Sequence, residues 1–148
     1  MVTLKHSVEI KTTPDTIFEW LKNLDQHYRE WHPDHIRWIN ITGRLDEGDT
    51  SYYEEYLHGK LHKIKFKITK VEENKRIEFK NLFPMSIICP KGSYILEPRE
   101  ESTIFTATLS FRFAWLFSKL AKNRVEAIKT HMKEEGENLK KLLEKRDN

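Results

Sequence analysis

Residues 2–21, VTLKHSVEIKTTPDTIFEWL, change from one periodicity to another within a short stretch. Residues 2–11 alternate between a mainly apolar set and a polar set, which is typical of a strand with one buried face. Thr13 is a candidate N-cap, Pro14 suits a first helical turn and Asp15 favours the positive end of a helix dipole. Apolar residues then recur at helical spacing, at Ile17, Phe18, Leu21 and Leu24. The stretch therefore predicts a strand followed directly by a helix.

The chain that follows predicts a second short helix and then a run of strands. The second helix extends from Leu24 through Trp31, and Pro33 ends it. Six strands are expected because alternating segments are separated by turn signals, at about 35–45, 50–58, 61–72, 75–83, 86–97 and 102–114. Their connections are too short for parallel crossovers, so the strands must be antiparallel.

The last segment predicts one long helix with an apolar stripe. Its apolar or small residues recur every three or four positions, at Phe117, Ala121, Val125, Ile128, Met132, Gly136, Leu139 and Leu143. Such a stripe fits a coiled coil or a face that docks on a sheet, and docking is favoured here. The last strand supplies an apolar partner face, with Phe105, Ala107, Leu109, Phe111 and Phe113.

Four short motifs carry a resemblance to a known superfamily. They are the opening strand with residues 12–21, the Trp-His-Pro at 31–33, Gly48 before the third strand, and residues 68–79. With the order of elements, they resemble the helix-grip fold of the START-related superfamily, which includes the birch-pollen allergen family, polyketide cyclase/dehydrase-like proteins and lipid-transfer domains. The resemblance covers nearly the whole chain and implies one α+β domain over residues 1–148. It also implies a curved seven-stranded antiparallel sheet around a long C-terminal helix, two short helices after strand 1, and a cavity between sheet and helix.

The composition excludes several other classes of protein. Of 148 residues, 38% are hydrophobic and 33% charged, which does not fit a disordered or collagen-like chain. A single cysteine, Cys89, excludes an internal disulfide and a cysteine-based zinc cage. The longest apolar run, residues 113–117, is far shorter than the ~20 residues of a membrane span, so membrane insertion is not expected. Lys5, His6 and Glu9 argue against a signal peptide, and we expect a cytoplasmic location.

A row of lysines admits two interpretations. Lys63, Lys65 and Lys67 alternate with Ile64, Phe66 and Ile68 in a chain whose net charge is +3. Such a row could follow a nucleic-acid backbone, or it could form the solvent-facing side of a half-buried strand. No aromatic residue shares the lysine face to stack on bases, so the second interpretation is favoured and no nucleic-acid partner is expected.

Six of the seven histidines precede residue 63, and four of them form two tight groups, HPDH at 32–35 and HGKLH at 58–62. With nearby carboxylates these imidazoles have the chemistry of a zinc or iron site. Their spacing matches no known metal motif, so no metal is expected. There is also no phosphate-binding glycine loop, and no nucleotide or other cofactor is expected.

The hairpin between the third and fourth strands places two polar residues on the apolar face. If Gly59 and Lys60 form its turn, His58 and His62 point to opposite faces of the sheet. Glu55 then shares the apolar face with His62, among Tyr53, Leu57, Ile64 and Phe66. A buried carboxylate needs a partner, so Glu55 contacts His62 or a polar ligand group, unless it lies in water at the cavity mouth.

Large aromatic residues are the candidates for the walls of a ligand pocket, although core packing is the favoured interpretation for any single one of them. With the two histidines of the first group, the candidate ligand-binding residues are Trp31, His32, His35, Trp38, Tyr53, Phe66, Phe79, Tyr94 and Phe111.

Three functions remain, in order of preference. The first is binding or transport of a hydrophobic small molecule, lipid-like or polyketide-like, by a monomer or weak homodimer. The second, which the resemblance implies, is a cyclase/dehydrase-type enzyme with Glu55 and His62 as catalytic acid and base and with His32 and His35 at the rim. The third is a protein-interaction or chaperone-regulator module that uses the basic C-terminal helix. The sequence does not identify the ligand.

Overall fold

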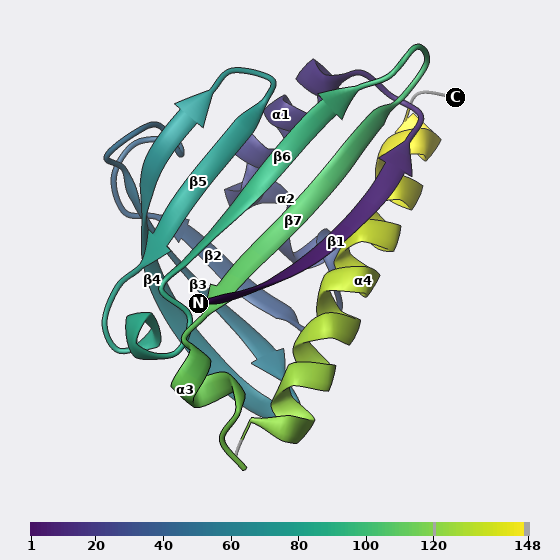
Figure 1. Cartoon of the computed structure of the whole chain (residues 1–148). Helices are drawn as coiled ribbons and strands as arrows, with labels where there is room; N and C mark the ends of the chain where they lie inside the picture. Colours follow the sequence, from purple (N-terminus) through teal and green to yellow (C-terminus); the bar gives the residue numbers. More distant parts are fainter. Residues whose placement is uncertain (120, 147–148) are drawn as a thin grey trace.

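The computed structural model describes residues 1–119 and 121–146, and it has the expected helix-grip architecture (Figure 1). Strand β1 (Val2–Ile10) is followed by the helices α1 (Pro14–Lys22) and α2 (Leu24–Trp31). The remaining elements are β2 (His35–Asn40), β3 (Thr50–Leu57), β4 (Lys60–Glu72), β5 (Arg76–Asn81), the 3₁₀ turn η1 (Met85–Ile87), β6 (Lys91–Pro98), β7 (Thr103–Phe111), α3 (Phe113–Leu116) and α4 (Lys122–Arg146).

All seven strands form one antiparallel sheet. Their spatial order is β1-β7-β6-β5-β4-β3-β2, so β1 closes the sheet beside β7 and β2 lies at the other edge. Register shifts between His35 and Arg37 and between Ile68 and Lys70 interrupt the pairing, and such irregularities bend and twist a sheet. The sheet is curved, and α4 lies along its open side next to β1 (Figure 1).

Helix α4 docks through the apolar stripe that the sequence predicts. Ile128, Met132, Leu139 and Leu143 are buried on the side that faces the sheet. Gly136 lies at the closest approach to β1, where an added Cβ would be only 2.9 Å from Cδ2 of His6. The small residue therefore lets the helix pack tightly against the edge strand, and the burial of the apolar stripe stabilises this position.

The ends of several elements differ from the prediction. Strand β7 stops at Phe111, and Phe113 begins the short helix α3 with 63% of its surface exposed, instead of extending the apolar face. Phe117 precedes α4 and is 69% exposed, so it is not part of the docked stripe. The expected strand over 86–97 begins only at Lys91, because the preceding Pro90 has no N–H for the sheet.

Two smaller expectations can be compared with the structure, and only the second agrees with it. Thr13 does not cap α1 through its side chain, because its Oγ1 pairs with Oγ1 of Thr16 at 2.9 Å. Lys63, Lys65 and Lys67 lie exposed on the outer face of β4, and the apolar residues that alternate with them, Ile64, Phe66 and Ile68, are buried. No helix within the described residues is long and apolar enough to cross a membrane.

The core consists of two parts with a cavity between them. The larger part packs α1, α2 and the end of α4 against the sheet, through residues such as Ile17, Trp31 and Leu139. The smaller part lies under the start of α4 and includes Phe111 and Ile128. Residues of both clusters line the cavity, so this fold leaves space where a solid core would lie.

Candidate functional site

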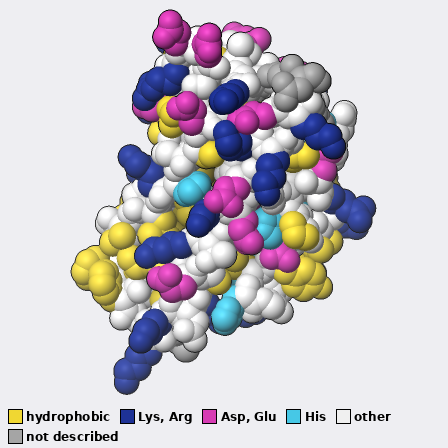
Figure 2. Space-filling model, turned by 90° about the vertical axis from the view of Figure 1, so that its right-hand side faces the viewer, with side chains coloured by type: hydrophobic (Ala, Val, Ile, Leu, Met, Phe, Trp, Pro, Cys, Tyr) yellow, Lys and Arg dark blue, Asp and Glu magenta, His cyan; other side chains and the backbone are white. Residues whose placement is uncertain are grey.

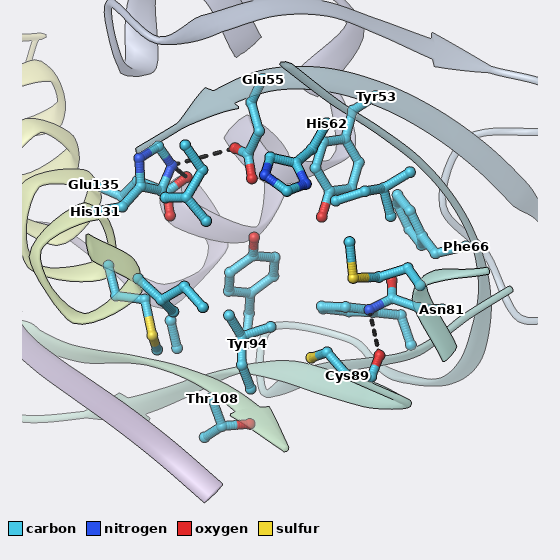
Figure 3. A pocket seen from close by; sticks show the side chains of 18 of the residues that line it. Tyr53, Glu55, His62, Phe66, Asn81, Cys89, Tyr94, Thr108, His131 and Glu135 are labelled. Carbon is cyan, nitrogen blue, oxygen red and sulfur yellow. Dashed lines mark hydrogen bonds and ion pairs between the residues drawn. The ribbon is translucent and has the colours of Figure 1, made fainter. Parts of the chain in front are cut away.

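The cavity has a volume of about 230 Å³ and lies between the sheet and α4 (Figure 3). Most of its wall is apolar, and aromatic rings contact one another around it, as those of Trp38 and Tyr53 do with centroids 5.4 Å apart. Seven of the nine residues proposed as ligand-binding line it: Trp31, Trp38, Tyr53, Phe66, Phe79, Tyr94 and Phe111. The side chains of His32 and His35 do not line it.

The hairpin between β3 and β4 places two polar side chains in this apolar wall. Leu57 pairs with Lys60, so the two-residue turn is His58–Gly59, with φ of 54° and 75°, and not residues 59–60. Moving a two-residue turn by one position shifts the pairing by two residues, which leaves every strand side chain on its face. Glu55 is therefore directly opposite His62, and both line the cavity (Figure 3).

His58 lies in the turn itself and not on the outer face of a strand as the predicted turn required. It is exposed and lines the edge of the cavity. It also lines a surface hollow of about 420 Å³, with Leu57 and with residues of α4 that include His131. The cavity and the hollow share these three residues, so the hollow adjoins the cavity between the hairpin and α4. Figure 2 shows the face that carries α4, where charged side chains predominate and histidines lie between them.

His62 is half-buried, and this position weakens its basicity. Burial lowers the pKa of His62, while the nearby Glu55 carboxylate acts in the opposite direction. The imidazole is therefore neutral at neutral pH and carries a lone pair on one nitrogen. A neutral imidazole in an apolar wall can accept a proton or a hydrogen bond from a ligand.

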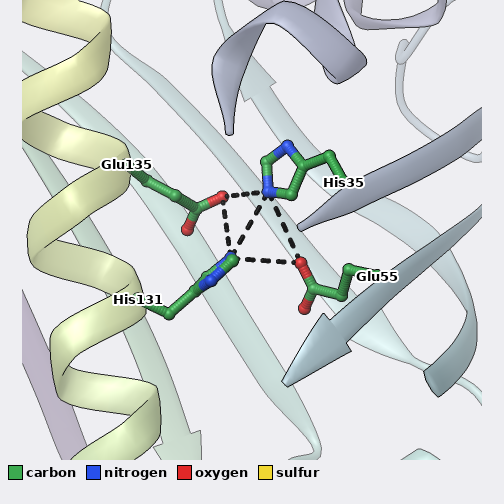
Figure 4. A group of neighbouring side chains, drawn as sticks. All are labelled: His35, Glu55, His131 and Glu135. Carbon is green, nitrogen blue, oxygen red and sulfur yellow. Dashed lines mark hydrogen bonds and ion pairs between the residues drawn. The ribbon is translucent and has the colours of Figure 1, made fainter. Parts of the chain in front are cut away.

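The Glu55 carboxylate contacts two other histidines, His35 and His131, and not His62. With Glu135, these residues form a group of four side chains (Figure 4). Its Oε2 lies 3.2 Å from Nε2 of His131 and 3.5 Å from Nε2 of His35. Oε2 of Glu135 lies 3.0 Å from Nε2 of His35 and 3.5 Å from Nε2 of His131. We call these four residues the His–Glu cluster. Three separate elements, β2, β3 and α4, bring them together.

The charges of the His–Glu cluster stabilise one another. Burial alone would lower the pKa of His131, but the charge and hydrogen bond of Glu135, with those of Glu55, outweigh it and raise this pKa to about 11. Burial alone would likewise raise the pKa of Glu135, but His131 and His35 outweigh it and hold this pKa below its ordinary value. Each buried charge is therefore compensated by an opposite one, as a buried charge requires.

His32 and His35 were expected at the cavity rim, and the structure corrects this. Both are buried, with 4% and 3% of their surfaces exposed. His32 accepts a hydrogen bond from the backbone N–H of Asp34 at Nδ1, and its Nε2 lies 3.2 Å from Oε1 of Glu134. The ring of His35 stacks on Tyr28 with centroids 3.9 Å apart. The irregular start of β2 turns His35 away from the cavity and toward α4.

A second polar group lies in the cavity wall, on β5. Nδ2 of Asn81 donates to the backbone carbonyl of Cys89 at 2.8 Å. Its Oδ1 is buried and has no hydrogen-bond partner among the described residues. Figure 3 shows Asn81 in the wall with its amide nitrogen turned to Cys89. An unpaired buried acceptor is costly, so this oxygen is a candidate contact for a ligand's donor group.

Sequence reasoning missed Asn81, His131 and Glu135. The last two are four residues apart and therefore lie on one face of α4. His131 directly precedes Met132 in the docked stripe, so helical periodicity alone would have turned it inward. No comparable signal marked Asn81, because a single amide at the end of a strand is common.

A protein family described as polyketide cyclase / dehydrase and lipid transport matches residues 1–144. The chain belongs to this family. No curated protein matches it significantly. The family's name covers both catalysis and transport, so membership by itself does not decide between the two.

Solved structures of other proteins share the fold of this family member. Ara h 8.0201 has a TM-score of 0.72 and 14% identity, with 95% of this chain and 96% of that chain covered. A START superfamily protein from Mycobacterium smegmatis has a TM-score of 0.68 and 16% identity, with 97% and 95% covered. The di-domain ARO/CYC StfQ from the steffimycin biosynthetic pathway has a TM-score of 0.74 and 14% identity, with 99% and 51% covered. Identities this low establish the shared fold alone.

Proposed function

We propose that this family member binds a hydrophobic small molecule that carries hydroxyl groups, in the cavity between the sheet and α4. The observation that supports this most is the combination of an apolar wall that includes several aromatic rings with an unpaired buried acceptor, Oδ1 of Asn81. Small-molecule sites are typically apolar with a few polar groups that fix the orientation of the ligand. The family description, which includes lipid transport, supports the same class of function.

The positions of the polar groups suggest the chemistry of the ligand. Asn81 offers an acceptor at one part of the wall, and Glu55 and His62 offer further acceptors on the hairpin. Acceptors bind donors, so hydroxyl or amine groups suit these positions and a carboxylate does not. The rings of Phe66 and Phe79, 5.3 Å apart, favour a flat or ring-containing body.

Catalysis of a cyclase type is a second candidate function, and the state of His62 favours it. Its lowered pKa keeps the imidazole neutral, and a neutral imidazole facing a ligand is a suitable general base. Glu55 lies directly across from it and would stabilise the imidazolium that forms. This function would be supported if the protein converts a bound compound and His62→Gln loses the conversion but keeps the binding. Binding without conversion would support a transport or storage role alone.

Binding of 2-naphthol and of naphthalene to the chelator-treated protein tests the main proposal. The two probes share a ring system and differ by one hydroxyl, and we expect the protein to bind both and to prefer 2-naphthol. Ala107 lines the cavity on β7, so Ala107→Phe should fill the space and abolish binding of both probes. Lys65→Phe adds the same ring on the exposed face of β4 and should leave binding unchanged.

Two outcomes would contradict the proposal. One is equal affinity of the Ala107→Phe and Lys65→Phe variants for 2-naphthol, because the probe would then bind outside the cavity. The other is no measurable binding of either probe to a wild-type protein with a cooperative thermal transition. Native mass spectrometry of the protein from its own source would then identify any natural occupant directly.

A further inference from the structure

The His–Glu cluster has the geometry of a metal site. Its four donor atoms are Nε2 of His35, Nε2 of His131, Oε2 of Glu55 and Oε2 of Glu135. Five of the six distances between them lie between 3.0 and 3.5 Å, including 3.3 Å between the two imidazole nitrogens. Four ligands placed tetrahedrally at 2.0–2.1 Å from one ion are about 3.3 Å apart. The spacing of the donor atoms therefore matches the edges of a tetrahedron around a zinc-sized ion.

The hydrogen bond of His35 leaves a lone pair at the centre of this arrangement. Nδ1 of His35 donates to the backbone carbonyl of Tyr28 at 2.8 Å, so Nδ1 carries a proton. In the neutral ring, Nε2 then has a lone pair, which faces two carboxylate oxygens and the other imidazole nitrogen. These acceptor atoms repel one another unless protons or a metal ion lie between them. Binding Nδ1–H to a backbone carbonyl is also how metal-ligating histidines are usually oriented.

Neighbouring residues hold the other ligands in place. The hydroxyl of Tyr28 donates to Oε2 of Glu55 at 3.1 Å. The indole N–H of Trp31 donates to the backbone carbonyl of Glu135 at 2.9 Å. His131 and Glu135 lie one helical turn apart on α4. The cluster is therefore preorganised by bonds outside itself, as metal centres are.

We propose that His35, Glu55, His131 and Glu135 bind one divalent transition-metal ion, with zinc as the ion whose size and tetrahedral preference fit best. Two imidazoles and two carboxylates suit Zn²⁺, and they also suit Fe²⁺ or Co²⁺. His131 also lines the surface hollow, so the cluster lies next to a solvent-filled depression. Three of the four residues line the cavity, so the bound ion would lie at its wall.

The competing explanation is that protons alone hold the cluster together. Two imidazolium ions would then balance two carboxylates, and each N–H would point at one acceptor. A metal ion is instead shared by all four donor atoms at once. Zinc binding distinguishes the two, because a cluster stabilised only by protons gains nothing from the ion. This inference goes beyond the proposed function, since the cavity can bind an apolar molecule with or without a metal.

Calorimetric titration of chelator-treated protein with Zn²⁺ tests the proposal. We expect one ion per chain and a higher melting temperature with zinc, because an ion that binds only the folded state stabilises it. Glu135→Gln and His131→Gln should each weaken zinc binding at least 100-fold. His27→Gln should not, because His27 pairs with Glu30 outside the cluster. Co²⁺ in place of Zn²⁺ should give the visible absorption of a tetrahedral site, which is lost in Glu135→Gln.

Three results would overturn the proposal. The first is a folded wild-type protein that takes up no zinc. The second is zinc uptake that Glu135→Gln and His131→Gln leave unchanged. The third is uptake lost in Asp34→Asn but kept in Glu135→Gln, which would place the ion among His32, Asp34 and His131, the other described group with suitable ligands. Naphthol binding, measured without metal, remains a separate test, so failure of either proposal is recognised independently.

Discussion

Nε2 of His131 on α4 lies 3.2 Å from Oε2 of Glu55 on β3, and the two side chains are only 9% and 13% exposed. This contact joins the C-terminal helix to the hairpin that forms the opposite wall of the cavity. Water screens so buried a pair much less than a surface pair. The contact therefore contributes to holding the cavity in shape, in addition to any part in binding.

The first prediction is that this contact couples the two residues energetically. A double-mutant cycle with His131→Gln and Glu55→Gln, measured by urea denaturation with a chelator present, should give a favourable coupling of about 1–3 kcal/mol. The chelator removes any contribution of a bound metal. A coupling within error of zero would show that the two side chains do not interact in the metal-free protein.

The second prediction concerns the docking of α4. Leu139 is completely buried against the sheet, so Leu139→Ala removes buried methyl groups and leaves a cavity. We expect the free energy of unfolding to fall by about 2–5 kcal/mol. Lys141 is exposed on the same helix, and Lys141→Ala should change stability by about 0.5 kcal/mol or less. Equal effects of the two substitutions in urea denaturation would contradict the docked position.

The sequence predicts the fold well because the fold depends on repeated patterns. The alternation in β1 and β4 and the stripe on α4 each repeat a simple signal over many residues, so single errors do not change the result. The termini of elements were predicted less well, since Phe113 and Phe117 continue an apolar pattern although the backbone turns away. Apolar residues at the end of a strand carry no signal for where the strand stops.

Only those site residues were predicted whose orientation follows from the alternation of side chains along a strand. Glu55 and His62 face the cavity because strand parity fixes their side, whatever the exact turn. The His–Glu cluster forms only because β2, β3 and α4 come together in space, and no local sequence pattern indicates that they do. His131 is far from the other histidines in sequence, so no local spacing links it to them. In the structure His131 lies beside His35, with 3.3 Å between their Nε2 atoms.

The third prediction is that Tyr28 acts as a positioning residue for the proposed metal centre. Tyr28→Phe keeps the ring that stacks on His35 and removes only the hydroxyl that donates to Glu55. Loss of such an outer hydrogen bond typically weakens metal binding about 10–100-fold. We expect that loss in zinc titrations, with the Co²⁺ spectrum shifted but still present. Unchanged zinc affinity would show that the hydroxyl does not orient Glu55.

The fourth prediction concerns the alkaline stability of the protein. Burial raises the pKa of the Cys89 thiol to about 12, whereas in the unfolded chain it has an ordinary pKa near 9. As pH rises above 9, the unfolded chain loses this proton and the folded chain keeps it, so unfolding becomes easier. Wild type should lose on the order of 2 kcal/mol more stability than Cys89→Ala between pH 8.5 and 10.5. Parallel curves for the two proteins in urea denaturation would contradict the burial of the thiol.

The fifth prediction is that Asn81 gives the cavity its preference for hydroxylated molecules. Asn81→Leu removes the unpaired Oδ1 and keeps a side chain of similar size, so 2-naphthol should lose its advantage over naphthalene. The advantage in wild type should be about 5–10-fold, since a hydrogen bond contributes about 1 kcal/mol net.

The ratio of the two affinities within one variant is the readout, because it cancels changes in stability or cavity shape. Such changes are expected, since Asn81→Leu also leaves the carbonyl of Cys89 without its donor. Thr108→Val is the matched control. Thr108 lies on β7 next to Ala107, but its side chain is on the outer face of the sheet, where its hydroxyl pairs with that of Ser93 at 2.6 Å, so Thr108→Val should leave the ratio unchanged. A ratio that Asn81→Leu leaves unchanged would contradict this role of Asn81.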